Sequence, residues 1–222
     1  MTRITIKSNY IHTHIGAGIT WSSSISNSLV ENNLITDNQL GMQFGGSDNI
    51  LINNTFVLSK PLDLPTSSLH PSVYYILLDL RWTSGTGSII KNNIFYIAQN
   101  SFYGKTVYAL ATTNSAPNSW NVDYNLWYTP STGTNWIWEN SLNKDFASTY
   151  KSITSWDNNG PPIPSDPLFV DFGYHIGTNS PARNAGDNSE CALTDIDGNT
   201  RPLEYTCDIG ADEFDGLNSK QF

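Results

Sequence analysis

One short pattern recurs along the first 128 residues and constrains the fold more than any other feature. It consists of an aliphatic residue, any residue, a polar residue, asparagine, any residue and a large apolar residue. Its asparagines lie 24, 21, 39 and 32 residues apart, by subtraction of the numbers of Asn9, Asn33, Asn54, Asn93 and, in a looser copy, Asn125. A strand-like repeat of roughly 20–25 residues is typical of a solenoid, in which each coil stacks on the next. The extra length between Asn54 and Asn93 is mostly an insertion at 59–72 with three prolines, which predicts a loop.

Aligning the copies on their asparagines gives two columns of apolar side chains that we expect to fill the interior. The first column comes three residues before each asparagine: Ile6, Val30, Leu51, Ile90 and Val122. The second comes two residues after it: Ile11, Ile35, Phe56, Phe95 and Trp127. The asparagines themselves are expected at bends, where they tolerate left-handed backbone and can hydrogen-bond from coil to coil.

A further strand is predicted in each coil from apolar alternation. In the first two coils the alternation places four residues inside: Ile19, Trp21, Met42 and Phe44. In the third coil it places three inside and three outside: Ile76, Leu78 and Leu80 inward, and Leu77, Asp79 and Arg81 outward. Residues 139–156 are predicted to form one short helix, so the expected organisation is coils over 1–138, a helix and linker over 139–165, and a C-terminal module over 166–222.

Composition narrows the classes of partner. The net charge of −9 argues against nucleic acid, which requires clustered Lys and Arg. Few charged residues (14%) and many aromatic ones (12%) suit an extracellular protein that meets sugars. No apolar run approaches the roughly 20 residues of a transmembrane helix. The chain shows no signal peptide and opens inside a repeat, so we expect further coils before Met1.

The two cysteines, Cys191 and Cys207, are a disulfide candidate that would close a surface loop. Neither a CxxC motif nor a Cys/His zinc spacing is present, so no metal site is expected from spacing.

The last fifty residues carry the most specific motif. The string DPLFVD…YHI…SPARNAGD…TDIDGNTRP…DIGADEF, within residues 166 to 214, resembles the C-terminal end of secreted bacterial right-handed parallel β-helix proteins of the pectate-lyase-like superfamily, which often carry a choice-of-anchor type terminal domain. The resemblance implies an all-β, right-handed parallel β-helix of about five coils with a small C-terminal β module. It also implies secretion and, in many members, polysaccharide lyase, glycoside hydrolase or epimerase activity.

The residues of the terminal motif are expected to have a structural role. Asp197-Gly198 is a tight-turn dipeptide, and Arg201 is expected to pair with Asp195, Asp208 or Glu213. A calcium loop is left open as the alternative, because Asp195, Asp197 and Asn199 alternate, although Gly198 comes one residue too early for an EF-hand.

The predicted catalytic site lies on the third coil. Asp79 and Arg81 share one face of a strand, with Lys60 and Asp63 in the neighbouring insertion. A lyase needs a base and a cation, which Asp79 with Arg81 or Lys60 would supply. A hydrolase needs two carboxylates about 5–9.5 Å apart, which Asp79 with Asp63 or Asp48 would supply. The structural alternative is an exposed Asp79–Arg81 ion pair.

Substrate-binding residues are expected beside that site: Trp82, Tyr74 and His70. A second set of aromatic residues is expected either to form a sugar-stacking platform or to cover the core at the edge of the solenoid: Trp120, Tyr124, Tyr128, Trp136 and Trp138. The expected function is an extracellular polysaccharide-acting or carbohydrate-binding protein, whose partner is a polysaccharide or cell-surface glycan. The alternative is a non-enzymatic adhesin or stalk.

Overall fold

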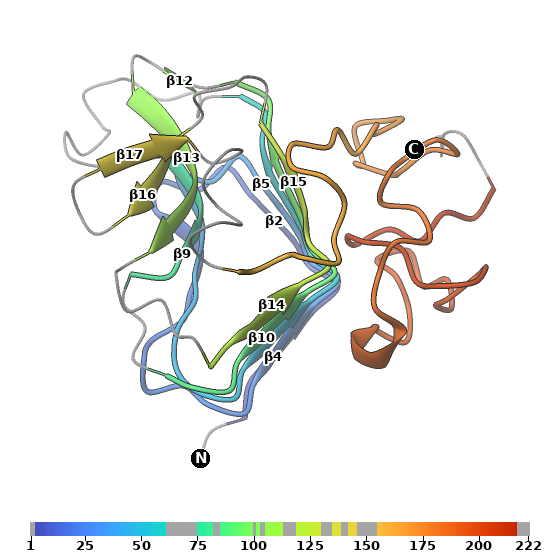
Figure 1. Ribbon diagram of the computed structural model, residues 1–222, viewed down its shortest axis with the longest axis horizontal. Coiled ribbons are helices and arrows are strands. Elements are labelled where there is room, and N and C mark those ends of the chain that lie inside the picture. The colour runs from blue at the N-terminus through green and yellow to red at the C-terminus, as the bar shows by residue number, and fades with distance from the viewer. Residues whose placement is uncertain are drawn as a thin grey trace.

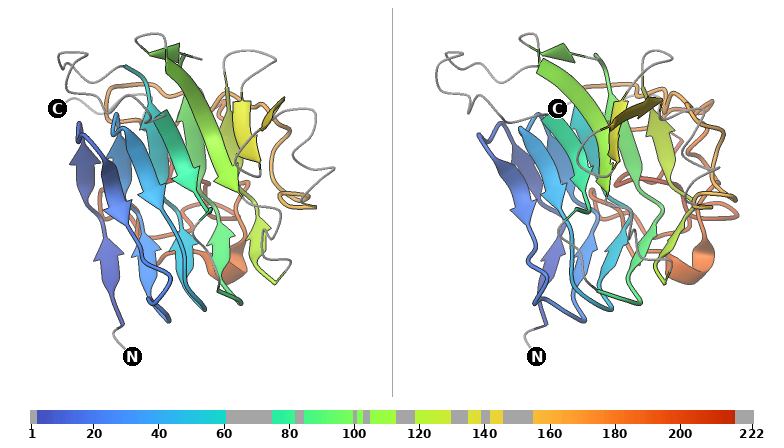
Figure 2. Two further views of the ribbon diagram at one scale, coloured as in Figure 1. Left: turned by 90° about the vertical axis from the view of Figure 1, so that its left-hand side faces the viewer. Right: turned by 60° about the vertical axis from the view of Figure 1, so that its left-hand side comes forward.

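The computed structural model describes residues 3–60, 75–81, 85–99, 101–102, 105–112, 119–129, 135–138, 142–145 and 155–216. In these residues the regular structure is β-strand, apart from a 3-10 turn, η2 (Asn188–Glu190). Along most of the chain, successive strands join each of three sheets in turn, and the strands of one sheet mostly pair in parallel. This arrangement is consistent with a β-solenoid. Figure 1 looks along the stack and shows three sheets around a common interior, and Figure 2 shows the strands of each sheet side by side.

Sheet A carries the first predicted column. Its strands run in the order β1–β4–β7–β10–β14, all parallel: β1 (Thr5–Lys7), β4 (Leu29–Glu31), β7 (Ile50–Ile52), β10 (Ile89–Lys91) and β14 (Asn121–Asp123). The column pairs in exact register from Ile6 through Val30, Leu51 and Ile90 to Val122. Ile6 packs against the core at its edge, and the other four are buried in it.

Sheet B carries the second column. Its strands run in the order β2–β5–β8–β11–β15: β2 (Tyr10–His12), β5 (Leu34–Thr36), β8 (Thr55–Leu58), β11 (Ile94–Ile97) and β15 (Leu126–Tyr128). The pairing joins Ile11, Ile35, Phe56, Phe95 and Trp127 in one row. The ring centroids of Phe56 and Phe95 are 5.0 Å apart, and those of Phe95 and Trp127 are 4.0 Å apart, so the rings stack through the core.

Sheet C closes the interior and departs from simple alternation. It contains β3 (Ala17–Thr20), β6 (Leu40–Gln43), β9 (Tyr75–Asp79), β13 (Lys105–Thr112), β16 (Asn135–Trp138) and β17 (Leu142–Asp145), with β12 (Ser101–Phe102) antiparallel to β13. Ile19, Trp21, Met42 and Phe44 are buried in the core, as alternation predicts.

The predicted facing of β9 is wrong at two residues. Leu77 and Leu78 both belong to the main core cluster, whereas Ile76 belongs to a separate cluster with Tyr108 and Ala111. The same kink occurs in β13, where Ala109 and Leu110 both face the core. Two consecutive inward residues interrupt the alternation of β9, although its pairing with β6 and β13 keeps one register through the break, so no extra residue is inserted relative to either neighbour.

Close approach explains the glycine at the same level of β6. A Cβ on Gly41 would lie 2.4 Å from the Leu77 carbonyl oxygen, so a larger residue would push β9 away.

The predicted helix over 139–156 is wrong in the part that the structure describes. Leu142–Asp145 form strand β17, antiparallel to β16. A short isolated helix is marginal, whereas the edge of β16 offers a row of backbone partners.

The repeated asparagines form a continuous amide ladder inside the bend between sheets A and B. The backbone N–H and side-chain Nδ2 of each asparagine donate to Oδ1 of its counterpart in the next layer, at 2.9–3.0 Å, from Asn9 through Asn33, Asn54 and Asn93 to Asn125. The left-handed backbone lies one residue earlier than expected, at Ser8, Asn32, Asn53, Asn92 and Tyr124. The ladder residues are therefore not the left-handed ones.

Three of the residues with left-handed backbone, all asparagines, hydrogen-bond to the C-terminal segment, residues 155–216. Asn32 Nδ2 donates to the Thr194 carbonyl, Asn53 Nδ2 to that of Asp208, and Asn92 Nδ2 to those of Asp187 and Glu190. Figure 1 shows the segment, in orange and red, beside the corner where the sheet of β4, β10 and β14 meets that of β2, β5 and β15.

The expected β module consists largely of turns. Its extended pairing is limited, among the described residues, to the bridges Phe169–Ile176 and Thr194–Thr200. Apolar contacts with sheet B complete the docking, because Ile94 and Leu126 form one buried cluster with Ile176, Ala182, Ile209 and Phe214. No helix in the described part of the chain is long and apolar enough to cross a membrane.

Candidate functional site

A cavity of about 370 Å³ opens where the C-terminal segment overhangs sheet B. The outer face of that sheet carries a row running from Tyr10 through Leu34, Thr55 and Ile94 to Leu126. The segment covers the far end of the row, since Ala211 N–H donates to Thr55 Oγ1 and Ile94 is buried beneath it. The near end stays open. We call this cavity the β2–β5 groove, lined by Tyr10, Leu34, Phe172, Gly173, His175, Ile196 and Asp197.

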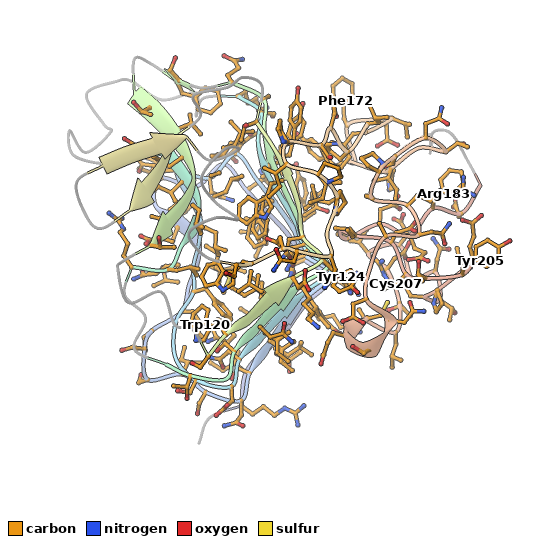
Figure 3. The ribbon with its side chains drawn as sticks, viewed as in Figure 1. Trp120, Tyr124, Phe172, Arg183, Tyr205 and Cys207 are labelled. Carbon is orange, nitrogen blue, oxygen red and sulfur yellow. The ribbon has the colours of Figure 1, made fainter. Side chains whose placement is uncertain are left out.

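Two exposed aromatic rings from distant parts of the chain line the groove. Phe172 is 99% exposed and Tyr10 is 59% exposed. The Tyr10 ring stacks on His12, with centroids 4.5 Å apart and the ring planes inclined by 29°. Figure 3 shows Phe172 at the edge of the C-terminal segment that lies toward sheet B. Exposed aromatic rings are unfavourable in water, so a pair of them beside one cavity is typical of a binding surface.

A polar wall of the groove surrounds His175. Its Nδ1 lies 2.8 Å from Asp171 Oδ1 and 2.7 Å from Asp171 Oδ2, and its Nε2 lies 3.1 Å from Asp197 Oδ2. The Ile176 N–H donates to Asp212 Oδ2 at 2.9 Å, which brings a third carboxylate to the same place. His175 and Asp212 are buried, whereas Asp197 reaches the surface.

The structure places Asp79 and Arg81 together as an ion pair. Arg81 Nε and Nη2 donate to the two oxygens of Asp79 at 3.0 and 2.9 Å, and the Arg81 backbone N–H donates to Oδ1 as well. Asp79 is buried rather than exposed. A general base needs a carboxylate oxygen that can take a proton, so catalysis here would require the pair to open. The catalytic assignment of Asp79 and Arg81 stays a prediction.

The structure describes one of the other predicted site residues, Lys60. Lys60 follows β8 in sheet B, and its backbone N–H donates to Asp37 Oδ1 at 3.1 Å. Asp63, His70, Tyr74 and Trp82 lie outside the described residues.

The second aromatic set is partly a core element. Trp120 is buried, donates from Nε1 to the Gly85 carbonyl oxygen at 3.0 Å and packs edge-on against Phe44. Tyr128 stacks on Tyr96 along sheet B, and Lys91 Nζ lies 5.9 Å from the centroid of the Tyr124 ring. The side chains of Trp136 and Trp138 lie outside the described ones.

The cysteines are neighbours and both are thiols in this structure. The hydrogen bond with Cys207 lowers the pKa of Cys191, and that same bond together with burial raises the pKa of Cys207. The disulfide between them stays a prediction.

The residues of the terminal motif stabilise turns. Asp195 accepts from the backbone N–H groups of Asp197 and Asn199 at 2.9 and 2.7 Å, which closes the turn at Gly198. Arg201 pairs with Glu213 at 2.9 Å and donates to the carbonyls of Asp208 and Gly210. These contacts agree with the structural reading of the motif.

Sequence reasoning missed the groove because its walls lie far apart in the chain. One signal was available in the Tyr174-His175-Ile176 stretch, a histidine inside the terminal motif with Asp171 four residues before it. In comparisons with known proteins, no family model and no curated protein matches this chain.

Proposed function

We propose that this chain is an extracellular or cell-surface carbohydrate-binding protein, and that the β2–β5 groove holds its glycan. The single observation that carries the proposal is the meeting of two solvent-exposed rings, Tyr10 and Phe172, at one cavity. Flat apolar rings match the C–H faces of sugars, and the groove volume falls within the roughly 300–1,000 Å³ of small-ligand sites. The acidic balance of the chain favours a neutral glycan.

The proposal also covers the handedness of the β-helix and the superfamily to which it belongs. The register of both apolar columns and the parallel sheets support a parallel β-helix, and the resemblance of the terminal motif supports a right-handed one of the pectate-lyase-like superfamily. The resemblance of the terminal motif supports a secreted protein with a docked terminal module.

The test measures binding to a panel of soluble and insoluble polysaccharides. Phe172→Ala removes an exposed ring without disturbing the core. We expect it to weaken glycan binding by about 1 kcal/mol, or roughly fivefold. Tyr205→Ala is the matched control, since Tyr205 is also exposed (86%) but lies on the far side of the C-terminal segment (Figure 3).

Equal loss in the two variants would place binding elsewhere. If no glycan binds the wild-type protein, the adhesin or stalk alternative becomes the better proposal, because the amide ladder alone makes a stiff rod.

An enzymatic role is the second candidate, because Asp79 and Arg81 lie together on the outer face of sheet C, where their pair would have to open for the carboxylate to act as a base. It proposes polysaccharide lyase or glycoside hydrolase chemistry. If a panel polysaccharide is cleaved, Asp79→Ala is expected to abolish the cleavage, and unchanged turnover would remove Asp79 from the mechanism.

A further inference from the structure

Three side chains converge at the polar wall of the β2–β5 groove. His175, Asp197 and Asp212 each offer one metal-ligating atom, and these atoms lie within 4.8 Å of one another. They come from three separate stretches of the C-terminal segment, so the cluster exists only in the folded chain. His175 and Asp212 are 4% and 5% exposed, and Asp197 opens the cluster to the groove.

Asp171 sets the direction of the imidazole. Both of its oxygens lie within 2.8 Å of Nδ1, so Nδ1 carries a proton and donates it to this carboxylate. A carboxylate that accepts from one ring nitrogen is the usual support of a metal-binding histidine, because it orients the ring and raises the basicity of the other nitrogen.

The opposite nitrogen then faces an acceptor. Nε2 lies 3.1 Å from Asp197 Oδ2. An oxygen of Asp212 completes a set of three ligand atoms that all lie within 4.8 Å of one another, a separation that one cation can bridge.

We propose that His175, Asp197 and Asp212 bind a divalent transition-metal cation, with Asp171 as the positioning residue. One imidazole and two carboxylates suit ions of the Mn²⁺ and Zn²⁺ class, whereas calcium takes six to eight oxygen ligands. The groove side leaves coordination positions for water or a bound molecule. This inference does not depend on the glycan proposal, because the probe is the metal alone.

The site escapes a search for metal motifs in the sequence. His175 and Asp197 lie 22 residues apart in the sequence, and Asp197 and Asp212 lie 15 apart, so the three ligands do not form a short sequence motif. Asp195, the residue that suggested a calcium loop, is not in the cluster, since its oxygens close the turn instead.

The experiment titrates Mn²⁺ into the full chain and follows the free ion by electron paramagnetic resonance. Mn²⁺ is chosen because the thiols of Cys191 and Cys207 prefer softer ions. We expect one saturable site per chain. Asp197→Asn keeps the size of the exposed ligand but removes its charge, and should weaken Mn²⁺ binding by at least about tenfold.

Glu190→Gln is the matched control. It removes the same charge from the same segment, on the η2 turn that docks against Asn92, and should leave Mn²⁺ binding unchanged. Thermal unfolding without metal confirms that both variants are folded.

Two outcomes overturn the proposal. One is the absence of saturable binding at millimolar Mn²⁺, which would leave the shared proton of an imidazolium as the explanation of the contact. The other is equal affinity in Asp197→Asn and wild type, which would place the ion elsewhere on the acidic surface.

Discussion

A single carboxylate ends the asparagine ladder. Asp157 is fully buried, and its Oδ1 accepts from both the backbone N–H and Nδ2 of Asn125 at 2.9 Å. Its Oδ2 accepts from Trp127 Nε1 at 2.9 Å. An aspartate suits this place because both of its oxygens only accept, so the last layer needs no further partner for an amide N–H.

Asp157→Asn tests that role. The amide would turn a donor toward either Asn125 or Trp127, leaving buried donors opposed, and we expect a loss of about 1–3 kcal/mol in the free energy of unfolding. Chemical denaturation followed by tryptophan fluorescence measures it. Unchanged stability would mean that the end of the ladder is not held by the carboxylate.

At the scale of the element, the paired asparagines divide two tasks between neighbouring residues. In the pairs 32–33, 53–54 and 92–93, the second residue joins the ladder and the first, in left-handed backbone, holds the C-terminal segment. Asn53 shows the division best, because its Nδ2 donates to the Asp208 carbonyl and its Oδ1 accepts from Ala192 N–H, each at 3.0 Å.

Asn53→Gly separates docking from backbone strain. Glycine adopts positive φ without penalty, so the change removes only the hydrogen bonds of the side chain. We expect faster hydrogen exchange around Ala192 and Asp208, with the sheets unaffected. Asn27→Gly is the control, since Asn27 has the same left-handed backbone (φ 53°) but is exposed. Equal exchange in both variants would contradict a docking role.

The strand register could be predicted because it is written in a local pattern. The same side-chain type recurs at each level, so aligning the asparagines also aligns Val30 with Leu51 and Ile35 with Phe56. The break in alternation at Leu77 could not be predicted, since Ile76, Leu77 and Leu78 are all apolar and either facing fits the pattern. Nor could the docking asparagines, because their partners are backbone carbonyls, which carry no sequence signal.

At the scale of the whole molecule, the position of the groove was harder to predict from the sequence than the fold was. The groove joins Tyr10 to Phe172, and only the docking of the C-terminal segment on sheet B brings them to one cavity. The sequence pointed instead to the outer face of β9, where Asp79 and Arg81 do lie together, but as a hydrogen-bonded pair. Pair formation depends on side-chain conformation, which residue spacing does not determine.

The raised pKa of one buried carboxyl group, that of Asp208, should make the free energy of unfolding depend on pH. Burial raises the pKa of Asp208 to about 7, from an ordinary value of 3.8, although the Asn184 and Phe214 N–H groups donate to it. Between these two pH values the folded state holds a proton that the unfolded state has lost. Stability should therefore fall as pH rises from about 4 to 7, by up to about 1.4 kcal/mol per pH unit.

Denaturation midpoints across that range measure the effect. Asp208→Asn cannot titrate, so its stability should fall less steeply with rising pH than that of the wild type. Identical slopes in the two proteins would assign the pH dependence to other carboxylates.

The outward asparagines also impose an order of events during synthesis. Every carbonyl that receives Asn32, Asn53 or Asn92 lies at least 95 residues further along the chain. The corner that they line therefore stays without these partners until the chain between Asp187 and Asp208 has left the ribosome. Contacts of such long separation form slowly, so residues 155–216 dock late, and the growing chain passes through a stage in which this corner is accessible to chaperones.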